Sequence, residues 1–341
     1  MKRIAIIAAV ASLLLPVQAL AWGTTGHRMI NNVGASALPA SVPAFLRTPD
    51  AVSDITALGP EMDRLKDSGQ SWDSDNDTGH FLDIGDDNKI AGVITLDALP
   101  PSFAAYDAAL RAIGQDPFKE GYVPYTILDG WEQVRKDFAY YRAESYAAAH
   151  ATSPADKTFF SRDLALRERL TIRDIGVWGH FVGDASQPLH ITIHFNGWGD
   201  YPNPNGYTTN HIHSFFESAF VRDHAQAAAV KALVPAYVPS VPSGLISQDS
   251  MLKQIGTYLA SSAARVHPLY ELQKTGDFDR GSPAATAFVD QCLAAGATQF
   301  RNWIALAWED SLNESVSYPN VNVRDILSGK VPLSPRSFAS D

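Results

Sequence analysis

The feature that most constrains the fold is the spacing of apolar residues, which is helical over most of the chain. The helical stretches include 24–36, 130–149, 161–187, 210–232, 249–271 and 284–313. Alternating apolar and polar residues, the pattern of a half-buried strand, are scarce. Loops rich in Pro, Gly, Asn and Asp lie near 73–79, 85–93, 196–210 and 236–243. The pattern predicts an all-α fold, a mainly helical single domain with long loops.

The first 21 residues, MKRIAIIAAVASLLLPVQALA, have the organisation of a secretory signal peptide. Two basic residues precede an apolar run at 4–15, and Ala-Leu-Ala at 19–21 fits the small-x-small cleavage rule. The apolar run is short for a membrane span. We therefore predict cleavage after Ala21, export to the periplasm or the medium, and no transmembrane segment in the mature chain. Residues 22–317 are the predicted domain, and 318–341 are expected to form an irregular C-terminal tail.

Charge and cysteine content exclude some classes of protein. Removal of the leader, with Lys2 and Arg3, lowers the formal net charge from −10 to −12. Such an acidic chain does not bind nucleic acid through a broad basic surface, so an anionic substrate needs a local site. The only cysteine is Cys292, so no internal disulfide forms. Its apolar helical surroundings predict that it is buried.

The stretch WGHFVGDASQPLH (178–190) has the spacing of a metal site. His180 and Asp184 are four residues apart, so both project from one helix face. Pro188 ends or bends that helix and brings His190 to a new position nearby. Imidazole and carboxylate groups on one face suit a zinc ion. The alternative is a solvated His–Asp pair on a surface helix.

The stretch NHIHSFFESAF (210–220) repeats the spacing with His213 and Glu217. A charge on so apolar a helix is expected near the core, where it needs a partner, and a metal would satisfy both groups. The alternative is an ordinary pair at the helix edge. His211 projects elsewhere on the helix and is expected to be a non-ligand.

Two further stretches offer candidate ligands. DSDNDTGHFLDI (73–84) does not fit an EF-hand, because Thr78 takes the glycine position and Ile84 takes that of the final Glu. His80 remains a candidate. After cleavage, Trp22 has a free α-amine with an ordinary pKa of about 7.7–8.0, so the amine and its own carbonyl can chelate a metal, and His27 can reach the same ion. The alternative is an aromatic N-terminus packed on the domain.

Together these stretches resemble the S1/P1 nuclease family, within the wider zinc-dependent phospholipase C/P1 nuclease superfamily. The matching motifs are Trp22-Gly-x-x-Gly-His27, the pair Asp63 and Lys66, HFLD at 80–83, GHFVGD and QPLH within 179–190, and H-x-x-x-E at 213–217. They span residues 22 to 217, and the C-terminal third adds no motif.

The resemblance implies an α-helical fold of the phospholipase C/P1 nuclease type with three Zn²⁺ ions. One ion would take Asp63, His80, His180 and Asp184, a second His190, His213 and Glu217, and a third the Trp22 amine and carbonyl, His27 and Asp184. Asp184 would then bridge two ions. Asp54 and Asp67 are rivals of Asp63 for the first site.

The implied activity is that of a zinc-dependent phosphoric ester hydrolase, an endonuclease and 3′-nucleotidase that cleaves single-stranded DNA and RNA through a zinc-bridged hydroxide. The implied catalytic residues are Asp63, Lys66 and Asp184. Lys66 would hold the phosphate, with Arg64 as a nearby substitute. Phe81 would stack on a base and Asp83 would bind its edge, or Phe81 would be a packing residue. The expected partners are single-stranded nucleic acid or nucleotides, with no obligate protein partner.

A second interpretation is a zinc-dependent phospholipase C that releases phosphocholine-type headgroups. The spacing of Trp22 and His27 favours the nuclease, whereas Glu217 stands where the nucleases usually have Asp and the bacterial phospholipases have Glu. The loop FNGWGDYPNPNGY (195–207), with Trp198 and Tyr201 expected to be exposed, suits either substrate. A third interpretation is a non-catalytic zinc-binding protein, although no ligand of the pattern is missing.

Overall fold

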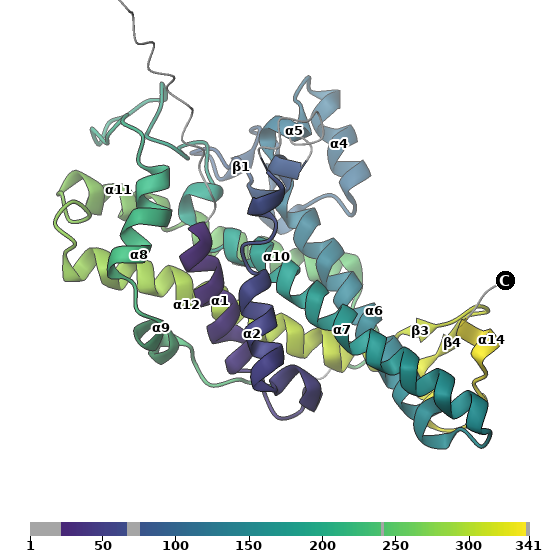
Figure 1. The fold of residues 1–341 in the computed structure, drawn as a ribbon. Coiled ribbons are helices and arrows are strands. Elements are labelled where there is room, and N and C mark those ends of the chain that lie inside the picture. The colour runs from purple at the N-terminus through teal and green to yellow at the C-terminus, as the bar shows by residue number, and fades with distance from the viewer. Residues whose placement is uncertain (1–21, 67–75, 240–241, 339–341) are drawn as a thin grey trace, which may run out of the picture.

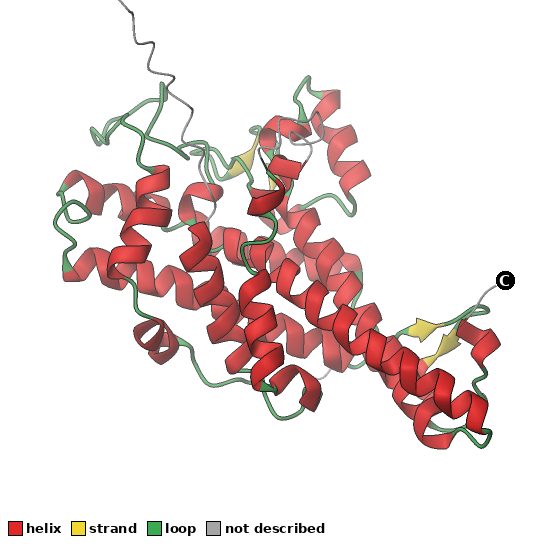
Figure 2. Cartoon of the chain, viewed as in Figure 1, coloured by secondary structure: helices red, strands yellow, loops and turns green. Residues whose placement is uncertain are grey.

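The computed structural model describes residues 22–66, 76–239 and 242–338, and most of these are helical (Figures 1 and 2). The predicted leader and Asp67 lie outside the described residues. Within the described ranges, paired strands are limited to two short antiparallel hairpins: β1 (Lys89–Ile90) with β2 (Ile94–Thr95), and β3 (Ser315–Val316) with β4 (Val321–Asn322). The prediction of an all-α fold is confirmed.

The helices vary widely in length. The α-helices are α1 (Gly23–Ser36), α2 (Pro49–Leu58), α4 (Phe103–Ala112), α5 (Pro117–Glu120), α6 (Val123–His150), α7 (Pro154–Asp184), α8 (Val221–His224), α9 (Ala227–Leu233), α10 (Gln248–Ala263), α11 (Val266–Lys274), α12 (Pro283–Asp310), α13 (Val323–Leu327) and α14 (Pro335–Phe338). The 3₁₀ turns are η1 (Ala44–Arg47), η2 (Asp63–Leu65), η3 (Thr78–His80), η4 (Leu96–Ala98), η5 (Pro188–His190) and η7 (Ser311–Asn313). Residues Phe215–Phe220 form a π-helix, η6. In the described part of the chain, no helix combines the length and apolar character that a membrane crossing requires.

Hydroxyl side chains set where several helices begin. The residues before α2, α4, α7, α10 and α12 each accept a hydrogen bond from a backbone N–H three residues later; they are Thr48, Ser102, Ser153, Ser247 and Ser282. Such caps satisfy N–H groups that the first helical turn leaves free. Proline is the first residue of α2, α7 and α12, where its missing N–H costs nothing. These starts are therefore encoded locally.

The end of α7 packs closely against α1, and two glycines allow that approach. A Cβ atom at Gly179 would lie 2.3 Å from Asn31 Oδ1, and one at Gly183 would lie 3.2 Å from His27 Nδ1. Helices α2 and α12 pack against the same pair, and α6 runs along α7 (Figure 1). This packing places the last two turns of α7 in the interior, where its polar residues meet those of α1.

Two large apolar clusters adjoin at the end of α7. One contains Trp131, Phe138 and Trp303 and includes Phe181 of α7. The other contains Trp22, Phe216 and Tyr270 and includes Leu189, which follows α7. The segment that joins α7 to η5 therefore passes from one core to the other.

The C-terminal residues are more regular than the sequence indicated. In place of an irregular tail over 318–341, the structure has β4, α13 and α14 within residues 321–338. Val316, Val323 and Ile326 are buried against Ala139 and Ala143 of α6. Elements of two to five residues are too short for a periodic signal, which explains the difference.

Candidate metal centre

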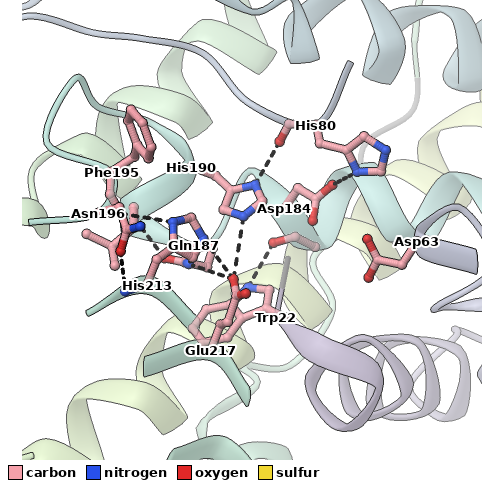
Figure 3. A network of polar contacts seen from close by, with 12 residues as sticks. Trp22, Asp63, His80, Asp184, Gln187, His190, Phe195, Asn196, His213 and Glu217 are labelled. Carbon is pink, nitrogen blue, oxygen red and sulfur yellow. Dashed lines mark hydrogen bonds and ion pairs between the residues drawn. The ribbon is translucent and has the colours of Figure 1, made fainter. Parts of the chain in front are cut away.

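Histidine and acidic side chains from separate segments converge near the end of α7, and Figure 3 shows six of them: Asp63, His80, Asp184, His190, His213 and Glu217. They form three groups, and within each group one ligand atom per residue lies within 4.8 Å of the others: His27, His180 and Asp184; Asp63, His80 and His180; and His190, His213 and Glu217. The structure thus brings together the eight side chains that the sequence singled out as ligands.

Asp184 joins the first two groups through its two oxygens. Its Oδ2 lies 2.9 Å from His80 Nδ1 and 3.3 Å from His180 Nε2. The second contact is expected, because His180 and Asp184 are four residues apart on α7. Its Oδ1 lies 3.4 Å from His27 Nε2. The rings of His27 and His180 stack with centroids 3.8 Å apart. Asp63 Oδ1 approaches His180 Nε2 at 3.6 Å.

The third group is built after the break that Pro188 introduces. Helix α7 ends at Asp184 and His190 closes η5. Glu217 Oε2 lies 2.8 Å from His213 Nε2 and 3.7 Å from His190 Nε2. Glu217 sits in the π-helix η6 rather than in the α-helix expected over 210–232, which the structure divides into η6, α8 and α9. Single π-turns are frequent at functional sites.

Backbone carbonyls set the orientation of three histidines. The Nδ1 atoms are held at 2.8 Å by Gly59 O for His180, at 2.9 Å by His80 O for His190, and at 2.9 Å by Phe195 O for His213. A carbonyl only accepts, so each Nδ1 carries the proton and each Nε2 presents a lone pair. Metal-binding histidines are commonly held in this way.

Burial controls the charge of the centre. Burial, followed by the neighbouring charge of His180, lowers the pKa of His27 well below its ordinary value. Burial, followed by the charge of Lys66, likewise lowers the pKa values of His80 and His180. These rings are therefore neutral ligands at pH 7. Burial raises the pKa of Asp184 well above its ordinary value, against the opposing effect of Lys66. A bound cation would favour its charged form.

Several atoms of the centre are buried without a hydrogen-bond partner. They are both ring nitrogens of His27, Nε2 of His80 and of His190, Oδ1 of Asp184 and Oε1 of Glu217. Leaving a buried polar group unpaired costs about 1–3 kcal/mol. Imidazole nitrogens and carboxylate oxygens are the ligands that zinc takes in proteins. The donor set therefore fits divalent metal ions.

A pocket of about 410 Å³ opens beside the centre. His80, His190 and His213 line it, and so do Lys66, Phe81 and Asp83, the residues predicted to bind substrate. Lys66 Nζ lies 3.1 Å from Asp63 Oδ1, and only 9% of its side chain is exposed. Burial, followed by the charge of Glu120, raises the pKa of Asp83 to about 8.

The structure separates the predicted residues from their rivals. Asp54 is exposed on α2, and Arg64 is exposed and pairs with Glu61 at 2.9 Å. His211 is exposed and belongs to none of the three groups. Of the two described candidates for this ligand, Asp54 and Asp63, only Asp63 belongs to one of the three groups.

Trp22 is buried beside the centre. Its indole Nε1 donates to Gly183 O at 3.0 Å and to Ser186 Oγ at 2.8 Å. Its carbonyl accepts from Gly26 N–H at 3.0 Å at the start of α1. Residue 21 lies outside the described residues, so ligation through the amine stays a prediction.

Sequence reasoning missed three residues of the site and misjudged one. Lys119 of α5 and Phe195, 49% exposed, line the pocket, and Gln187 contacts the third group. Gln187 lay within the QPLH motif and Phe195 at the start of the loop expected to meet substrate, whereas nothing local pointed to Lys119. Trp198, expected to be exposed, is 2% exposed because its ring stacks on His194 with centroids 3.6 Å apart; Tyr201 is 44% exposed, as expected.

Comparisons with known proteins give a distant likeness in structure. No protein-family model matches the chain, and no curated protein matches it. Among solved structures, the chain is similar to Clostridium perfringens alpha-toxin isolated from avian strain SWCP. The two share 15% sequence identity over 88% of this chain and 68% of that chain, with a TM-score of 0.38.

Proposed function

We propose that the protein is a metal-dependent phosphoric ester hydrolase that cleaves phosphodiesters. The observation that carries the proposal is the junction of three histidine–carboxylate groups with one pocket lined by Lys66. Cations held there, together with Lys66, would make a positive site in an acidic chain. A phosphate could then bind without a broad basic surface.

The proposed cofactors are three Zn²⁺ ions held by the residues that the sequence singled out. Asp63, His80, His180 and Asp184 would hold one ion, His190, His213 and Glu217 another, and Trp22, His27 and Asp184 the third. Such ions supply Lewis-acid chemistry, because they lower the pKa of water and neutralise negative charge on phosphoryl oxygens.

The chain itself contributes binding and orientation. Lys66 would hold a phosphate oxygen, and Asp63, 3.1 Å from Lys66 Nζ, would keep the ammonium group at the pocket. Cys292 is not a candidate nucleophile, because it is fully buried and burial raises its pKa to about 11. Nucleophilic attack would therefore fall to water.

The substrates that we propose first are single-stranded nucleic acids and nucleotides. Phe81 and Asp83 line the pocket together with His80. An aromatic ring can stack on any base, and such stacking contributes about 1–3 kcal/mol per base. Asp83 offers a carboxyl group to the edge of that base.

A phospholipid is the second candidate, and the mouth of the pocket favours it. Phe195 is 49% exposed at the pocket, and Tyr201 is 44% exposed in the same loop. Exposed aromatic side chains of this kind are common where a protein meets a lipid surface. With Glu217 in the third group, this loop suits the release of a phosphocholine-type headgroup.

Turnover by the purified, zinc-loaded protein tests the proposal. The substrates are single-stranded DNA, single-stranded RNA, phosphatidylcholine vesicles and a small aryl phosphodiester, each with and without chelator. We expect chelator-sensitive hydrolysis of the small diester and of nucleic acid. Asp63→Asn should abolish this hydrolysis. The matched control Asp54→Asn, at an exposed carboxylate, should retain it.

The substrates separate the outcomes. Release of phosphocholine without cleavage of nucleic acid would replace the nuclease by the phospholipase while keeping the metal centre. Failure to hydrolyse any of the four substrates, with zinc bound, would contradict the hydrolase and favour a zinc-binding protein.

We also propose that the chain is exported, because its first 21 residues have the organisation of a signal peptide. N-terminal sequencing of the protein recovered from its host should start at Trp22. A start at Met1 would contradict both export and metal binding by the Trp22 amine.

A further inference from the structure

Gln187 is completely buried between the end of α7 and η5. Its Oε1 accepts a hydrogen bond from Leu189 N–H at 2.7 Å. Since only the oxygen end of the amide can accept, this contact decides that the NH₂ end faces the other way. The orientation of the side chain is therefore set by the turn in which it lies.

The NH₂ end of Gln187 meets the third group (Figure 3). Its Nε2 lies 3.3 Å from Glu217 Oε2 and 3.2 Å from His213 Nε2. His213 Nδ1 carries its proton toward Phe195 O, so His213 Nε2 is an acceptor. Gln187 thus directs one N–H to Glu217 Oε2, while its amide also faces the His213 Nε2 lone pair that a metal ion would take.

The backbone of Gln187 links this group to Asp184. Gln187 N–H donates to Asp184 O at 2.9 Å, and His190 N–H donates to Gln187 O at 3.0 Å. The amide is therefore held rigidly between α7 and His190. A donor in such a place restricts the rotation of the Glu217 carboxylate, whose Oε2 also lies 2.8 Å from His213 Nε2.

We propose that Gln187 is a positioning residue, which orients Glu217 for metal binding together with His190 and His213. The inference rests on the proposed function, since it requires an ion at this group. Residues that orient ligands typically change metal affinity by about 10–100-fold when they are replaced. In the described part of the chain, the side-chain hydrogen bonds of Gln187 go to this group and to Leu189, so the effect should be confined to one ion.

Zinc titration of the metal-free protein against a chromophoric chelator tests the inference without reference to activity. We expect Gln187→Met to weaken one zinc site by about 10–100-fold and to leave the others unchanged. Gln187→Leu also lacks the N–H groups, and it adds neither a charge nor a further metal ligand. It should show the same loss of zinc affinity, and it replaces Gln187→Met in the test if that variant does not fold.

Gln133→Met is the matched control. Gln133 Nε2 also donates to a carboxylate, Asp137 Oδ1, at 3.1 Å, but it lies on α6 outside the centre. Its substitution should leave every zinc affinity unchanged.

The outcomes distinguish this inference from the proposed function. Wild-type protein without zinc at the third group would overturn both. Wild-type protein that binds zinc there, with Gln187→Met or Gln187→Leu binding it equally well, would overturn the positioning role alone.

Discussion

The metal centre and the arginine network of α6 and α7 both bury carboxylates, but they balance them differently. We define the arginine network as Arg135 and Arg167 with the acids that they contact. Arg135 lies 3.1 Å from Asp310 and 3.2 Å from Glu314. Arg167 lies 2.8 Å from Asp137 and 3.6 Å from Glu144. Here the chain supplies the opposite charge itself.

In the metal centre, by contrast, Asp184 faces three imidazoles that burial keeps neutral. The charge of Lys66 opposes the rise in the Asp184 pKa, but Lys66 pairs with Asp63. A buried carboxylate without a matching charge is costly. The comparison teaches that the chain places its own cations beside the carboxylates of the arginine network, whereas in the candidate metal centre the matching charge would come from the proposed cations.

The largest expected effect is that of Asp184→Ala in the metal centre. Asp184 contacts His27, His80 and His180, so its loss should remove two of the bound zinc ions. Activity on a small phosphodiester should fall roughly 1,000-fold, since Lewis-acid stabilisation is worth several kcal/mol. Elemental analysis counts the ions. An unchanged zinc content would contradict the prediction that Asp184 bridges two ions.

The matching change in the arginine network is Arg135→Met, which leaves Asp310 buried without its cation, while Glu314 keeps Lys136 at 3.1 Å. Breaking a buried ion pair from one side typically costs about 3–5 kcal/mol. Urea unfolding should show that loss, while zinc content and activity of the folded protein stay unchanged. A loss of zinc instead of stability would mean that the two regions are not separate.

Metal removal should destabilise the protein by a smaller amount. Ions that bind only the folded state stabilise it by about 2.7 kcal/mol at a free concentration 100 times the Kd. Thermal unfolding with and without chelator measures this increment. The increment should be the same in Arg135→Met, because distant sites act additively. A chelator that leaves the unfolding of the wild type unchanged would contradict a metal centre.

The smallest expected effect concerns pH in the arginine network. Burial raises the pKa of Glu144 to about 8, although the charge of Arg167 opposes it. The folded protein therefore keeps a proton that the unfolded chain releases above about pH 4, and stability falls as the pH rises toward 8. Glu144→Gln should gain about 1.4 kcal/mol relative to wild type between pH 6 and pH 7. Unfolding at both pH values measures it, and a difference independent of pH would contradict a protonated Glu144.

Much of the fold and part of the site follow from local patterns. The helical periodicity over 130–149, 161–187 and 284–313 corresponds to α6, α7 and α12. The spacing of His180 and Asp184 placed both on one face of α7, and Pro188 marked the break before His190. The π-helix η6 and the short elements after residue 320 were not predictable, since neither leaves a distinct period in the sequence.

By itself, the sequence determined where the long helices lie, that Cys292 is buried, and which histidines and acidic residues are candidate ligands. These depend on residues within a few positions of one another. Tertiary structure alone decided that Asp63 rather than Asp54 lies in the centre, that Lys119 and Phe195 line the pocket, that Trp198 is buried and that Gln187 faces Glu217. Each of these depends on how segments distant in the chain pack together, and local periodicity carries no record of that packing.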